Sequence, residues 1–133
     1  MQDRHYGFGC TLNEPLEEAV SKTTEALKSE GFGVLTTIDV QATLEAKLGV
    51  ERKPYIILGA CNPNLAYRAL QAEPEVGLLL PCNVIVYEDE PGISHVSIVD
   101  PLQMLGVVEN ENLGAVATEA EERLRRVAEK LQG

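Results

Sequence analysis

The sequence predicts an α+β fold, a two-layer sandwich in which one mainly antiparallel sheet carries helices packed on one face. Short aliphatic and β-branched segments alternate with amphipathic ones, so the chain supplies both strands and helices. Several of the strands follow one another as hairpins, which favours an antiparallel sheet over a strict alternation of strand and helix. A length of 133 residues predicts a single domain over 1–133.

The first part of the chain predicts two strands, each followed by a helix. We expect a strand over 5–12 and then a helix over 16–27, with Asn13 as its cap, Pro15 in its first turn and Gly31 at its end. Residues 33–40 are short and β-branched and predict the second strand. Residues 41–48 predict a short helix that Gly49 ends.

The middle of the chain predicts the centre of the sheet. Residues 55–60 are apolar at every position and predict a central strand, after which Asn62-Pro63 opens a helix with Leu65, Ala66, Ala69 and Leu70 on its buried side. Residues 76–80 and 84–87 predict two strands that Pro81 separates. The acidic residues 88–90 lack the alternating ligands of a calcium loop, so with Pro91-Gly92 they predict a solvated turn.

The last part of the chain predicts a strand and two helices. Residues 93–99 pair back as the second strand of a hairpin, and Pro101 starts a short helix around Met104 and Leu105, with Asp100 as a capping residue. Apolar residues from Leu113 to Leu131 form one helical stripe, beside Glu–Arg pairs spaced four apart at 119–123, 121–125 and 122–126. Two interpretations of this helix stay open: it covers the sheet, or it also contacts a second subunit.

The charge of the chain excludes two classes of partner. The formal net charge of −10 repels phosphate backbones and anionic lipid, so we expect neither nucleic acid nor a membrane as a partner. The N-terminal residues are polar where a signal peptide would be apolar, and three cysteines cannot all pair within the chain. We therefore expect a cytoplasmic protein with free thiols.

Two cysteine-containing bends are the most suggestive positions for function: Cys61-Asn62-Pro63 and Pro81-Cys82-Asn83. Cys61 lies where a strand passes into a helix, and unpaired amides with the positive end of the helix dipole predict a lowered thiol pKa there. Cys82 follows a proline that interrupts strand pairing, so its backbone is expected to be accessible. A purely structural interpretation also stays open, with buried thiols, Asn62 as a helix cap and Pro81 as a strand breaker.

His95 is a further candidate because a histidine base can activate a cysteine nucleophile. Placing Glu88 opposite Ile93 in the hairpin puts Cys82 and His95 on one face but four positions apart, roughly 13 Å along the strands. At such a separation a direct hydrogen bond needs a bulge in the hairpin or a neighbouring subunit. The sequence has no CxxC pair, phosphate-binding loop, GxSxG or HExxH, so it predicts no catalytic residue and no metal ligand and identifies no cofactor.

Two segments together resemble a known family, the domain of unknown function 302. They are Tyr55 to Pro63, which contains GACNP, and Leu78 to Tyr87, which contains LPCN, and weaker similarity continues at Gly7-Phe8-Gly9 and at 33–40. The resemblance implies a two-layer α+β fold of TATA-binding-protein-like shape that is commonly dimeric. It also gives weight to Cys61, Asn62, Pro63, Pro81 and Cys82, and it implies no activity.

The sequence leaves three functions open. The first is a homodimeric module that binds a small molecule near Cys61, Asn62, Pro63, Pro81, Cys82, Asn83 and His95, which fits the aliphatic strands and the missing catalytic motifs. The second is an interaction or oligomerisation domain, because an uncovered sheet face that is not fully polar needs a partner. The third is a thiol redox or soft-metal site formed by Cys61 and Cys82.

Overall fold

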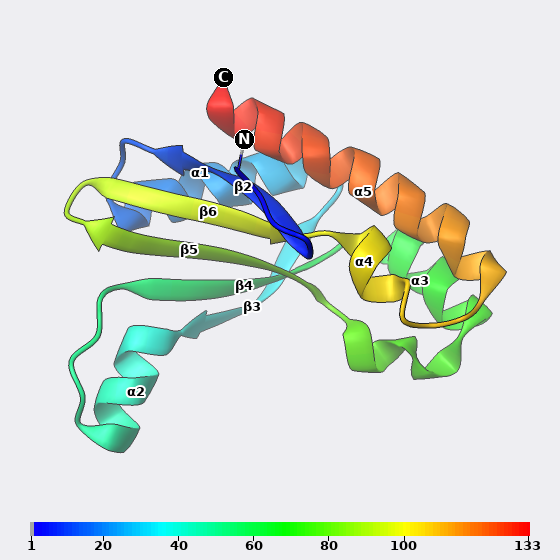
Figure 1. The fold of residues 1–133 in the computed structure, drawn as a ribbon, viewed down its shortest axis with the longest axis horizontal. Coiled ribbons are helices and arrows are strands. Elements are labelled where there is room, and N and C mark those ends of the chain that lie inside the picture. The colour runs from blue at the N-terminus through cyan, green and yellow to red at the C-terminus, as the bar shows by residue number, and fades with distance from the viewer. Residues whose placement is uncertain (1) are drawn as a thin grey trace.

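A computed structural model describes residues 2–133 and shows one antiparallel sheet of six strands in the order β1-β2-β6-β5-β4-β3 (Figure 1). The strands are β1 Gln2–Asp3, β2 Gly7–Leu12, β3 Gly33–Asp39, β4 Tyr55–Cys61, β5 Cys82–Glu90 and β6 Ile93–Val99. The helices are α1 Leu16–Ser29, α2 Val40–Leu48, α3 Pro63–Ala72, α4 Pro101–Leu105 and α5 Glu111–Gln132, with a 3₁₀ helix η1 at Pro74–Leu79. The predicted α+β fold is therefore confirmed.

The helices cover one face of this sheet. The helices α1 and α5 contact the strands directly, α3 and α4 pack against α5 near one end of the sheet, and α2 extends away from the opposite end (Figure 1). Side chains of the central strands alternate, and those on the covered face form the core with α1 and α5: Phe8, Val84, Val86, Val96, Ile98, Leu27 and Leu124. No helix among residues 2–133 is long and apolar enough to cross a membrane.

The start of α1 differs from the prediction. The cap position is Pro15, and the Asn13 side chain makes no capping hydrogen bond. Instead, Oε2 of Glu88 accepts a hydrogen bond from the Leu16 backbone N–H at 3.1 Å. Glu88 lies in β5, so the predicted solvated turn over 88–90 is wrong, and a residue distant in sequence satisfies the helix terminus.

The predicted strand over 76–80 is also wrong, because this segment forms η1. Pro74 begins the helix, and the Glu73 side chain accepts a hydrogen bond from the Glu75 backbone N–H. Both edges of β4 are already paired, with β3 and β5, so the sheet has no place for another strand beside it. Only Val76 of this segment is fully buried.

The β5–β6 hairpin has a different register from the one expected. Its register shifts between Glu88 and Glu90, and Glu90 rather than Glu88 stands opposite Ile93. This irregularity places Val86 opposite Val96 and Val84 opposite Ile98, so that all four side chains reach the covered face. The buried valines therefore determine the register, and every later pairing moves by one residue.

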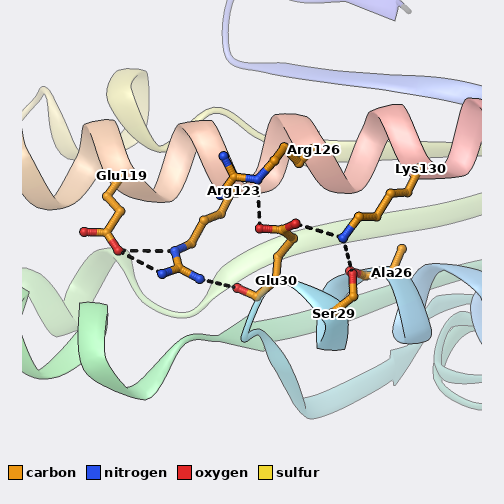
Figure 2. Close-up of polar contacts among 7 residues, drawn as sticks. All are labelled: Ala26, Ser29, Glu30, Glu119, Arg123, Arg126 and Lys130. Carbon is orange, nitrogen blue, oxygen red and sulfur yellow. Dashed lines mark hydrogen bonds and ion pairs between the residues drawn. The ribbon is translucent and has the colours of Figure 1, made fainter.

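Glu30 joins the end of α1 to α5 (Figure 2). Its carboxylate accepts hydrogen bonds from Nε of Arg126 at 3.0 Å and from Nζ of Lys130 at 2.8 Å. Its backbone carbonyl accepts another from Arg123, which also pairs with Glu119. Arg126 thus binds a distant carboxylate instead of pairing with Glu122 as expected, and these ion pairs hold the two helices that cover the sheet.

Replacing Glu30 with Gln is expected to lower the free energy of unfolding at pH 7 by about 1–2 kcal/mol, since the charge-assisted hydrogen bonds are lost. Lys130 and Arg126 hold the pKa of Glu30 below its ordinary value of 4.5. The stabilisation is therefore present above pH 4.5 and is lost as the pH falls through the lowered pKa. Urea unfolding of wild type and Glu30→Gln between pH 3 and pH 7 measures this difference.

The matched control is Glu25→Gln on α1, because Glu25 is exposed and forms no ion pair with any residue over 2–133. This control should change stability little at any pH. A difference between wild type and Glu30→Gln that stays constant down to pH 3 would contradict the assignment.

Candidate functional site

A cavity of about 340 Å³ lies where one end of the sheet meets the helices. Its sheet side consists of Ala60, Cys61 and Cys82, and the segment before β5 adds Leu80 and Pro81. The helices α3, α4 and α5 contribute further apolar side chains, among them Leu65, Ala66, Ala69, Leu105, Val116 and Ala120. With Phe32 and Leu35, the result is an apolar cavity formed by five segments that are far apart in sequence.

The pairing of β4 with β5 brings the two cysteine-containing bends together. Ala60 stands opposite Cys82 in the register, so Cys61 at the end of β4 lies beside the start of β5. Four of the candidate residues line the cavity: Cys61, Asn62, Pro81 and Cys82. Pro63 occupies the first turn of α3, is exposed and does not line it.

Both cysteines in these bends are free thiols with raised pKa values. Burial, and then the nearby Cys61, raise the pKa of Cys82 to about 11, and burial also raises the pKa of Cys61. The lowered pKa predicted for Cys61 is therefore wrong, because burial of the thiol disfavours its charged form. Oδ1 of Asn62 accepts the hydrogen bond from the Leu65 backbone N–H at 3.2 Å.

Asn62 has the structural role of a helix cap, as one of the two interpretations predicted. It is buried, it caps α3, and it packs against the turn that ends α1. Gly31 in that turn has a φ of +84°, and a Cβ there would lie 2.8 Å from Nδ2 of Asn62. Glycine is therefore required at position 31 both by its backbone conformation and by the close approach of this amide.

The structure does not bring His95 or Asn83 to this cavity. The corrected register places His95 opposite Tyr87 and Asn83 opposite Gly59, on the sheet face that no described helix covers. Cys82 pairs with Ala60 on the covered face. A contact between Cys82 and His95 is excluded because the two side chains lie on opposite faces, not because of the distance that the expected register implied.

His95 instead belongs to a row of side chains across the uncovered face. Tyr55 and Tyr87 stack with ring centroids 5.4 Å apart, and the Tyr87 and His95 centroids are 5.0 Å apart. Nδ1 of His95 lies 3.0 Å from Oγ1 of Thr11, and its Nε2 lies 3.2 Å from Oδ2 of Asp89. We call Tyr55, Tyr87 and His95 the aromatic row.

The sequence indicated the cavity only in part. Spacing on α3 identified Leu65, Ala66, Ala69 and Leu70 as a buried side, and the structure buries Leu65 and Ala69 while Ala66 and Leu70 line the opening to solvent. The contributions of α4 and α5 had no separate signal, because their lining residues belong to ordinary apolar stripes. Within residues 2–133, no group of three or more His, Cys, Asp or Glu side chains could hold a metal ion.

Alkylation should distinguish Cys82 from an ordinary thiol. With a pKa of about 11, its reaction with iodoacetamide should be slow at pH 8 and should rise about tenfold per pH unit up to pH 10. Mass spectrometry of peptides after timed labelling measures the rate, and the chain unfolded in urea is the control. Labelling of Cys82 at pH 7 equally fast in folded and unfolded chain would contradict both its burial and its pKa.

The comparisons with known proteins agree with this architecture. The chain matches the family described as Domain of unknown function DUF302 over residues 8–131. It is similar to the crystal structure of an uncharacterized conserved protein DUF302 from Bacillus stearothermophilus, with a TM-score of 0.86 and 30% identity, over 96% of this chain and 98% of that chain. A comparison with curated proteins found no match. The chain therefore belongs to the family Domain of unknown function DUF302.

Proposed function

We propose that this protein binds a small, uncharged, apolar molecule in the cavity beside Cys61 and Cys82. The observation that carries the proposal is the lining of that cavity, which is almost wholly aliphatic over about 340 Å³ and contains no charged side chain. The one amide among the lining residues, Asn62, already caps α3. A cavity of this size and character falls within the range of ordinary small-molecule sites.

The net charge of the chain favours a neutral ligand over an anionic one. The state of the two thiols favours binding of that ligand over a reaction with it. A net charge of −10 disfavours an anionic head group such as a carboxylate beside the opening. The raised pKa values keep both thiols protonated at neutral pH, so neither is activated as a nucleophile, and the described residues place no base beside them. The cysteines then serve as polarisable apolar contacts, and thiol redox chemistry is the weaker hypothesis.

Filling the cavity should weaken the binding of an apolar ligand. Ala66 on α3 is only half-buried and lines the cavity, so Ala66→Leu adds volume there with room to adjust. Fluorescence titration with the neutral dye N-phenyl-1-naphthylamine should show saturable binding to wild type and at least tenfold weaker binding to Ala66→Leu. Ala115→Leu, which adds the same volume on the exposed surface of α5 outside the cavity, should bind as wild type does. Equal dye binding by all three proteins would contradict the site.

A second proposal is that two copies of the chain associate through β3 and α2. β3 is the outer strand of the sheet, so one of its edges has no pairing partner. It contains neither lysine nor proline, and its only charged side chain, Asp39, caps α2 by accepting a hydrogen bond from Ala42. Such an edge is a favourable template for another strand.

The surface around β3 is both apolar and locally uncharged. Four of its large apolar side chains are exposed: Leu35 by 68%, Ile38 by 48%, Leu48 by 67% and Val50 by 43%. Residues 33–54 hold three acidic and three basic side chains and therefore carry no net charge, although the whole chain carries −10. Two copies approaching through this segment avoid the repulsion that opposes contact elsewhere. A two-fold axis would pair the two β3 strands antiparallel.

The dimer should be lost when a charge enters this surface. Sedimentation velocity should show a dimer for wild type and a monomer for Ile38→Glu, because two facing carboxylates would be buried without partners. Leu78→Glu is the control, since Leu78 is 84% exposed on η1, outside this surface. A monomeric wild-type chain at 100 µM would contradict the proposal.

The acidic charge also supports the proposed absence of nucleic acid and membrane partners. The three free thiols support a cytoplasmic location, where reduced cysteines persist.

A further inference from the structure

A second cavity, of about 410 Å³, lies on the uncovered face of the sheet. We call it the open-face groove and define it by its six long or polar lining residues: Arg4, Tyr6, Tyr55, Asn83, Tyr87 and Ser97. It lies on the opposite face from Cys82, and its lining shares no residue with the cavity of the proposed function. Whatever binds in the groove therefore binds independently of that cavity.

The floor of the open-face groove suits a flat apolar group. Ile85 and Val99 supply its aliphatic surface. Gly7, the first residue of β2, adds backbone without a side chain. A Cβ at Gly7 would lie 2.9 Å from the carbonyl oxygen of Ile98, so the close pairing of β2 with β6 favours glycine here. The lack of a side chain at this position leaves the floor shallow and level.

One wall of the groove, the tyrosine wall, consists of the ring edges of Tyr55 and Tyr87. The rings of Tyr55 and Tyr87 stack at an interplanar angle of 14°, with His95 beyond Tyr87 and the guanidinium of Arg52 over Tyr55 at 4.9 Å. Because neighbours cover the faces of these rings, only their edges and hydroxyls are available to a ligand. Ring edges are electropositive and favour the face of another aromatic ring.

The charge in the groove is opposite in sign to that of the chain. Among the described residues that line it, Arg4 is the only one with a charge, although acidic residues outnumber basic ones 21 to 11 in the sequence. The Arg4 guanidinium forms no ion pair with any residue over 2–133, and the side chains of Asn83 and Ser97 form no hydrogen bond there. The groove thus offers one cation and several polar groups that no protein atom occupies.

We propose that the open-face groove binds a planar aromatic carboxylate. The carboxylate pairs with the Arg4 guanidinium, whose fork of N–H donors matches its two oxygens. The ring lies on the floor formed by Gly7, Ile85 and Val99, with its face toward the edge of the tyrosine wall. Asn83 and Ser97 supply hydrogen bonds to further polar substituents.

Benzoate is the probe for this site, and the ¹⁵N-labelled full chain is the sample. Titration followed by amide chemical shifts should move residues 4–7, 83–87 and 95–99 in a saturable manner and leave α3 unmoved. Benzamide, which keeps the ring and loses the charge, and cyclohexanecarboxylate, which keeps the charge and loses the planar ring, should each bind at least fivefold more weakly.

A pair of matched variants tests the role of Arg4. Arg4→Gln should weaken benzoate binding about tenfold, the usual effect of losing a charge-assisted pair. Lys28→Gln removes the same charge from the exposed surface of α1, outside both the groove and the β3 surface, and should weaken binding by less than twofold.

Four outcomes would overturn the proposal: no saturable shift at the groove, benzamide binding as tightly as benzoate, an unchanged affinity in Arg4→Gln, or shifts confined to α3. Groove amides that move with protein concentration in the absence of benzoate would also overturn it, because a second copy of the chain would then cover this face. Apart from shifts confined to α3, which would place benzoate in the other cavity, these results leave dye binding beside Cys61 and Cys82 unaffected, so the two proposals fail separately.

Discussion

The one-sided burial of an antiparallel sheet is the constraint on which the rest of this structure depends. Side chains alternate along β5 and β6, and only the face that carries Val84, Val86, Val96 and Ile98 meets α1 and α5 (Figure 1). The core, the hairpin register and the position of each candidate residue follow from this alternation. Because side chains alternate along a strand, Asn83 and His95 lie on the uncovered face while their neighbours in sequence are buried.

The two faces of the sheet are suited to different chemistry. Where the helices leave space at the end of the covered face, apolar atoms and protonated thiols surround it together with the one amide of Asn62, which favours an uncharged apolar ligand. The other face holds a groove between a wall of stacked tyrosines and Arg4, and this groove is more polar and locally cationic. The sheet thus separates two cavities that share strands but no lining residue.

Charge explains which contacts stabilise this acidic chain. Glu30, although acidic, is held by Arg126 and Lys130, so several of the scarce basic residues fasten α5 to α1 (Figure 2). The segment over 33–54 balances its charges and keeps four large apolar side chains exposed. Repulsion elsewhere on the surface and the absence of net charge here are the basis for the proposed association at β3.

The sequence by itself determined the α+β class, most helices, and the caps at Asn62 and Asp100, because hydrophobic period and capping chemistry are local. It also predicted that the bends at Cys61 and Cys82 would meet. Only the tertiary structure decided the cap of α1 by Glu88, the helical form of 74–79 and the pairing of His95 with Tyr87. Each of these depends on a partner distant in sequence, and a shift of one residue in register exchanges the two faces of a strand.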